Sequence, residues 1–169
     1  MKSLNKIISV LVVVCMMASI VPLTVFASST SVSTYAELVS AVASASDGDV
    51  ITLTADVTAT STIAVAGNIT ITGNKAIIRS SSFTGKIFNV TGALTLENVE
   101  VNSNRTTTTD LTNEVAYVAT GATMNLKGGS SIHAARANMS TSCGGIWVDG
   151  TLNMYEGSML YDLHTHNNS

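Results

Sequence analysis

A pattern centred on glycine recurs four times in this chain. Each copy reads apolar, any, apolar, any, glycine, any, apolar, any, apolar, as in the stretch 88–96. The glycines are Gly67, Gly92, Gly121 and Gly150, at intervals of 25, 29 and 29 residues. The third copy has one extra residue after its glycine, which predicts a bulge. Periods of about 20 to 50 residues are typical of solenoids and propellers, in which each repeat packs on its neighbours.

The alternation within each copy predicts two short strands that join at the glycine and place every second residue inside. Aligning the copies gives four inward rows. These rows are Ile63, Phe88, Tyr117 and Ile146; Val65, Val90, Ala119 and Val148; Ile69, Leu94, Met124 and Leu152; and Ile71, Leu96, Leu126 and Met154. One outward row, Thr70, Thr95, Asn125 and Asn153, can form a hydrogen-bonded ladder. The glycine permits a bend that a side chain would obstruct.

The repeat length selects between the two architectures. A propeller blade needs four antiparallel strands, and these repeats are too short for that. Three short strands and three turns fit 25 to 29 residues, which predicts an all-β parallel β-helix with coils about 4.8 Å apart. Aromatic residues at 5% and charged residues at 11% agree with stacked strands better than with a helical bundle.

A short helix should precede the strands. Thr34 and Glu37 have the spacing of a capping box, and Leu38 and Val42 follow at helical spacing. The sequence therefore predicts a helix over residues 35–45 that covers the first coil and protects its open edge.

The N-terminal residues read as a secretory signal peptide. Lys2 and Lys6 precede an apolar run, and Val25 and Ala27 supply small residues before a cleavage point after Ala27. The alternative is a membrane anchor, for which the apolar run is too short and interrupted. The expected organisation is a leader over 1–27, an N-terminal segment with the capping helix over 28–48, and β-helix coils over 49–169.

The net charge and the cysteine content limit the classes of binding partner and the cross-links that the chain can have. Removing the two leader lysines from 8 basic and 11 acidic residues leaves a net charge of −5, which argues against nucleic acid and anionic membranes. Cys143 is then the single cysteine, so no internal disulfide framework is expected, and nothing indicates a cofactor. The predicted location is extracellular, with no membrane span after the leader is removed.

The helix followed by "DGDVITL", and the copies "LTLENVEV" and "GGIWVDGTLNMYEGS", resemble the right-handed β-helix superfamily that includes pectate lyases. The nearer likeness is to repeat-bearing surface and adhesin-like proteins of bacteria. The resemblance spans almost all of the chain after the leader and implies a right-handed helix. It is specific for the fold and weak for activity, since one fold serves many functions.

Trp147 is the leading candidate for ligand contact. Its equivalents in other copies, Asn89 and Val118, place it outward, and Asp149 lies two residues on along the same side. An exposed indole can stack on a sugar ring, with Tyr155 flanking it. The alternative is an aromatic side chain covered by a loop or a neighbouring coil.

Catalysis would require clustered charges on adjacent coils. The resemblance to β-helix lyases implies several carboxylates that bind calcium and a basic residue, and hydrolases use paired carboxylates. Glu97, Lys127 and Tyr155 align outward as a cross-strand ion pair with a neighbouring aromatic, and Asp149 stands alone. No catalytic residue is predicted, so an enzyme is the less favoured class.

Asp162, His164 and His166 alternate, and a strand would place all three on one face with metal-ligand spacing. The alternative is a polar turn. His133 has no evident partner in the sequence.

These features predict a secreted or cell-surface β-helix module with an adhesive or structural role, in contact with polysaccharide or host-cell glycans. The competing expectation is the N-terminal part of a polysaccharide lyase or glycoside hydrolase whose active coils lie downstream. Ser131–Ile132 and Met159–Leu160 occupy equivalent places 28 residues apart. The same interval from Gly144 passes Ser169, which predicts a longer polypeptide that is attached to the cell wall through later regions.

Overall fold

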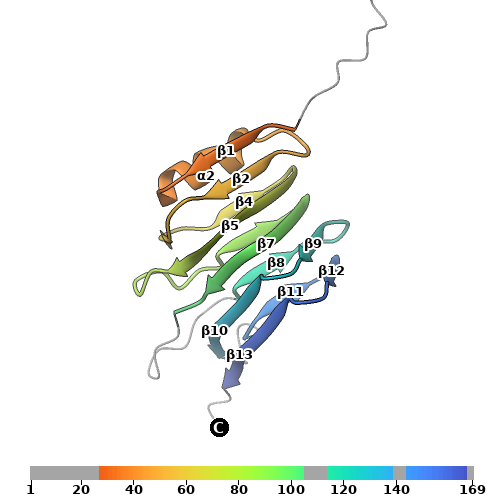
Figure 1. The fold of residues 1–169 in the computed structure, drawn as a ribbon. Helices are drawn as coiled ribbons and strands as arrows, with labels where there is room; N and C mark the ends of the chain where they lie inside the picture. Colours follow the sequence, from red (N-terminus) through yellow and green to blue (C-terminus); the bar gives the residue numbers. More distant parts are fainter. Residues whose placement is uncertain (1–26, 105–113, 139–143, 167–169) are drawn as a thin grey trace, which may run out of the picture.

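The computed structural model describes residues 27–104, 114–138 and 144–166. It is a parallel β-solenoid with one short α-helix at its N-terminal end (Figure 1). Every strand pair is parallel, so the predicted all-β parallel architecture is confirmed.

Two sheets wrap around one core. The four-stranded sheet contains β4 (Ile63–Val65), β6 (Phe88–Val90), β8 (Ala116–Val118) and β11 (Ile146–Val148). The nine-stranded sheet contains β1 (Ser29–Val32), β2 (Val50–Leu53), β3 (Val57–Ala59), β5 (Asn68–Arg79), β7 (Ala93–Asn102), β9 (Thr123–Leu126), β10 (Ser131–Asn138), β12 (Thr151–Met154) and β13 (Met159–His166). From β4 onward, each coil contributes one strand to the smaller sheet and then follows the larger sheet around a bend.

Most of the predicted inward rows are present. Ile69, Leu94 and Met124 lie in register in the larger sheet and are buried. Ile71, Leu96 and Leu126 form the adjoining row and are fully buried. Three members of the predicted outward ladder are hydrogen-bonded in the structure: the Asn153 amide donates to Asn125 at 2.9 Å, and the Asn125 amide donates to Thr95 at 3.2 Å.

The predicted register of the third copy is wrong by one residue. Ala116 and Val118, not Tyr117 and Ala119, pair with Phe88 and Val90 and are buried. Both alternatives are apolar, so the alternation cannot separate them. Burying Tyr117 would leave its hydroxyl without water, which is costly unless a partner is supplied. The additional residues of this copy lie in the turn before Thr123, which includes Gly121, rather than in a bulge after that glycine.

The repeated glycines have two different physical reasons. A Cβ atom on Gly92 would lie 2.2 Å from the Ala66 carbonyl oxygen, and one on Gly150 would lie 2.3 Å from that of Ala119. These two positions require a backbone approach that only glycine permits. Gly121 instead has φ of +82° with open space around it, so it serves a left-handed turn.

Helix α2 (Tyr35–Ser44) covers the first coil, as predicted. The Glu37 amide donates to the Thr34 hydroxyl, and the Thr34 amide donates to the Glu37 carboxylate, which completes the capping box. Leu38 and Val42 are buried and belong to the same apolar cluster as the solenoid core. Figure 1 shows the helix at one end of the stack, opposite β13.

A second bend inside the larger sheet depends on left-handed residues. Asn74 and Asn98 have φ of 54° and 53° in two coils, and Gly129 and Gly157 have φ of 75° and 80° in the next two. Asparagine and glycine are the residues that adopt this conformation most readily. The bend turns β5 and β7 without ending them.

Arg79 is an exception in the apolar interior. It pairs with Ala59 on β3 and is buried. Its guanidinium group donates to the carbonyl oxygens of Thr84 at 3.3 Å and Glu114 at 3.4 Å. Burial lowers the pKa of Arg79 to about 10, and the charge of Glu114 opposes that shift. Arg79 therefore stays cationic at neutral pH and links the loops that precede β6 and β8.

Candidate functional site

Trp147 and Asp149 point outward from the smaller sheet at β11. The indole of Trp147 is 48% exposed, and its Nε1–H donates to the Asp149 carboxylate at 3.0 Å. The predicted outward orientation is therefore present, and no described loop hides the ring. The hydrogen bond limits the rotation of the indole while leaving much of its surface open to solvent.

Tyr117 completes this group because of the corrected register. It lies beside Trp147 on the neighbouring strand β8, and its hydroxyl donates to Asp149 Oδ2 at 2.8 Å. This hydrogen bond raises the pKa of Tyr117, because loss of the phenolic proton would remove the bond and place two anions together. We name Lys86, Tyr117, Trp147 and Asp149 the aromatic–carboxylate patch.

Lys86 extends the patch toward the preceding coil. Its ammonium nitrogen lies 4.8 Å from the centre of the Tyr117 ring and 2.7 Å from a Glu114 carboxylate oxygen. A cation near the face of an aromatic ring is attracted to it, so Lys86 helps to hold the Tyr117 ring in place. The patch thus combines flat aromatic surface, which can stack on a sugar ring, with a cation and a carboxylate, which can bind the hydroxyl groups of the sugar.

Tyr155 is not part of the aromatic–carboxylate patch. It follows β12 in the larger sheet, is 51% exposed, and its amide donates to the Leu126 carbonyl. Lys127 occupies the equivalent position in the neighbouring coil and lies beside Glu97 of the coil before it. The outward alignment predicted for Glu97, Lys127 and Tyr155 is therefore present. Within the described ranges, no ion pair joins Glu97 to Lys127.

The predicted metal triplet is only partly described. His164 Nε2 lies 2.9 Å from Asp162 Oδ1, so these two side chains meet. Asp162 has φ of 52°, which interrupts the strand alternation on which the prediction relied. The side chain of His166 lies outside the described residues. Among the side chains that are described, no group of three histidine, cysteine or acidic residues could hold a metal ion.

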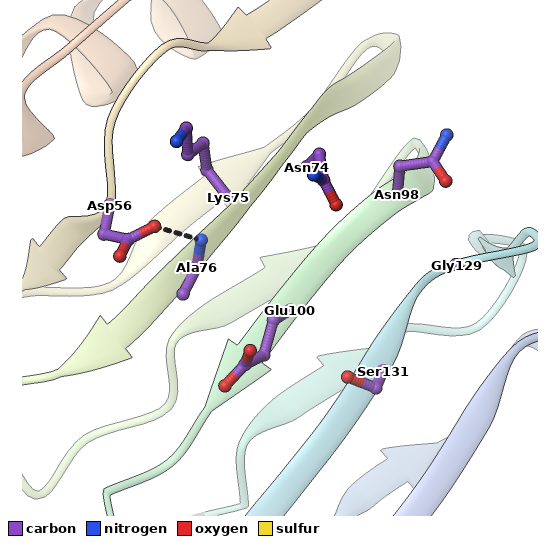
Figure 2. Close-up of a pocket in the computed structure, with 8 residues that line it drawn as sticks. All are labelled: Asp56, Asn74, Lys75, Ala76, Asn98, Glu100, Gly129 and Ser131. Atoms are coloured by element: carbon purple, nitrogen blue, oxygen red, sulfur yellow. Dashed lines mark hydrogen bonds between the residues drawn. The ribbon is translucent and has the colours of Figure 1, made fainter.

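A polar groove lies on the larger sheet, at the left-handed bend (Figure 2). Its volume is about 220 Å³. The lining residues are Asp56, Asn74, Lys75, Ala76, Asn98, Glu100, Gly129 and Ser131. This groove was not predicted from the sequence, although "GN" at Gly73–Asn74 marks the bend that forms it.

The carboxylates of the groove have partners. Asp56 accepts a hydrogen bond from the Ala76 amide at 2.9 Å, and Glu100 lies 2.8 Å from His133 Nε2. The His133 ring is stacked on Tyr161 with centroids 4.6 Å apart. These contacts order the groove wall, and they correct the expectation that His133 lacks a partner.

The fold and the patch define a class, a parallel β-solenoid with an ordered aromatic–carboxylate surface. Comparison with protein families, curated proteins and solved structures found no match for this chain. In the part of the chain that the structure describes, none of the helices has the length and apolar character needed to cross a membrane.

Proposed function

We propose that this chain is a secreted or cell-surface β-helix module that binds glycans and has an adhesive or structural role rather than a catalytic one. The proposal places it near the pectate-lyase-like β-helix superfamily and the repeat-bearing bacterial surface proteins. The leader-like segment 1–27 supports export. The parallel β-solenoid is the fold that this resemblance implies.

The observation that carries the proposal is the half-exposed Trp147, oriented by Asp149, which Tyr117 also bonds. An exposed tryptophan that moved freely would lose conformational freedom on binding, which costs affinity. Here the ring is oriented before a ligand arrives. Each Asp149 oxygen accepts one protein hydrogen bond and retains capacity for a ligand hydroxyl.

Trp147 is the only tryptophan, so its fluorescence reports directly on ligand contact. We expect saturable quenching or a blue shift with one of three probes, the soluble oligosaccharides of glucose, N-acetylglucosamine or galacturonic acid. Calorimetry should then show affinity reduced at least about tenfold in Trp147→Ala, equivalent to about 1.4 kcal/mol.

Asn89→Ala is the matched control, because Asn89 occupies the equivalent outward position two coils earlier in the same sheet. This variant should bind as the unmodified chain does. No binding across the three probes, or equal binding by Trp147→Ala, would contradict the proposed glycan contact.

A further inference from the structure

In the described part of the chain, Ser28 is the first residue that is hydrogen-bonded to the solenoid. Its amide donates to Asp49 Oδ1 at 2.7 Å, and its carbonyl oxygen accepts from the Val50 amide at 2.8 Å. Strand β1 begins at the next residue, Ser29, and pairs with β2 at the edge of the larger sheet (Figure 1). The chain therefore joins the sheet at Ser28.

The carboxylate of Asp49 is held in position by a second donor. Its Oδ2 accepts from the Ser46 amide at 2.9 Å, and the Asp49 amide donates to the Ser46 carbonyl oxygen at 3.1 Å. The hydrogen bonds from Ser28 and Ser46 lower the pKa of Asp49, so this side chain is anionic at neutral pH. The turn after α2 thus presents a fixed negative charge to the nitrogen of Ser28.

The stretch of sequence that contains this turn is acidic. Between residues 28 and 74 there is no lysine, arginine or histidine. The same stretch contains four acidic residues: Glu37, Asp47, Asp49 and Asp56. A positive charge on the nitrogen of Ser28 would be the single cation of this stretch, and it would lie at hydrogen-bonding distance from a carboxylate.

We propose that leader removal after Ala27 creates an ion pair at this point, in which the new α-ammonium group of Ser28 binds the Asp49 carboxylate and fixes the N-terminus to the first coil. This inference rests on the export that the proposed function includes. Hydrolysis of the Ala27–Ser28 peptide bond by a leader-cleaving peptidase consumes one water molecule. Ala27 leaves as a carboxylate, and the proton of the new carboxylic acid passes to the Ser28 amine. A neutral amide with one donor thereby becomes a cation with three donors.

The sequence and the structure select the same peptide bond on separate grounds. Val25 and Ala27 are the small residues that precede a leader cleavage point. Ala27 and Ser28 are exposed, so the solenoid does not cover the bond between them. Cleavage after Ser28 would remove the carbonyl group to which Val50 donates, and cleavage before Ala27 would leave the nitrogen of Ser28 a neutral amide.

Intact mass and N-terminal sequencing of the chain that a bacterium secretes test the cleavage. We expect the secreted chain to begin at Ser28, and any other first residue would overturn the proposal. A chain that stays in the cell with its leader attached would overturn it as well, and that result would also contradict the proposed export.

Nitrogen-15 NMR titration of the α-amino group of the secreted chain tests the ion pair. The midpoint should fall by about 0.5 pH unit or more in Asp49→Asn, because loss of the neighbouring carboxylate makes the ammonium form less favourable. Asp47→Asn is the matched control, since Asp47 lies in the same turn but accepts from the Asn68 amide at 2.8 Å. This variant should lower the midpoint by less than about half as much. An unchanged midpoint in Asp49→Asn would overturn the ion pair and leave cleavage and export in place.

The dependence of the same titration on salt needs no variant. Salt screens the attraction between exposed charges, so the midpoint should fall as the salt concentration rises. A midpoint that does not respond to salt would overturn the ion pair. These measurements do not depend on glycan binding at Trp147, so the two proposals can fail separately.

Discussion

At the scale of single residues, Asp149 shows how one side chain connects two coils. It accepts from Trp147 on its own strand and from Tyr117 on the neighbouring strand. The Tyr117 ring also packs under the Lys86 ammonium group. A carboxylate with two donors at fixed positions holds both aromatic side chains in one arrangement, so the patch has a defined shape before any ligand binds.

This arrangement predicts an alkaline titration. The hydrogen bond to Asp149 raises the pKa of Tyr117, so the bond stabilises the fold while Tyr117 is protonated. That contribution is lost as the pH rises through the raised pKa in the folded state. Asp149→Asn should bring the pKa of Tyr117 down toward its ordinary value, because the neighbouring negative charge is removed.

Phenolate absorbance of the folded chain measures this shift. Tyr117→Phe identifies the contribution of Tyr117 among the four tyrosines. An unchanged midpoint in Asp149→Asn would mean that the carboxylate does not control Tyr117.

At the scale of elements, α2 stabilises the chain through its position rather than its length. It has ten residues, and isolated helices of that length are marginal in water. The capping box satisfies donors at its N-terminus, and its apolar face covers the first coil. The helix therefore depends on the solenoid, and the first coil depends on the helix.

Leu38→Asp tests that mutual dependence. Leu38 is fully buried, so the substitution places a carboxylate in an apolar contact. We expect a loss of about 2 kcal/mol or more in the free energy of unfolding, measured by urea denaturation. Ser40→Asp introduces the same residue on the exposed side of the helix and should change stability by less than about 0.5 kcal/mol. Equal stability of the two variants would show that α2 does not cover the core.

At the scale of the whole molecule, the described part of the solenoid has two side surfaces with different chemistry. The smaller sheet displays the aromatic–carboxylate patch, and the larger sheet contains the polar groove (Figure 2). Glu100 in the groove is engaged by His133, and Asp56 by the backbone. These contacts hold the two carboxylates of the groove in defined positions.

Because the sequence predicts no catalytic cluster, we expect the chain to lack lyase activity. The chain should release no unsaturated product from pectin or alginate in the presence of calcium, measured by ultraviolet absorbance. A pectate lyase, assayed in parallel, serves as the control for substrate quality. Product formation that Asp149→Asn or Glu97→Gln abolishes would favour the competing enzyme class.

The sequence by itself determined the solenoid, the capping helix and most of the core rows. Glycine spacing and strict alternation are local signals. Because the coils are similar, each copy repeats these signals, and the copies can be aligned with one another. The polar ladder through Thr95, Asn125 and Asn153 follows from the same alignment. Outward placement of Trp147 could be predicted for the same reason.

Only the tertiary structure decided the register of the third copy and the composition of the candidate site. Ala116–Ala119 is apolar on both faces, so contacts with β6 and β11 selected which side is buried. That choice placed Tyr117 beside Asp149 from 32 residues away. The pair of Glu100 and His133 and the burial of Arg79 likewise join coils distant in sequence. Such contacts depend on how many residues each turn contains, which the local pattern leaves undetermined.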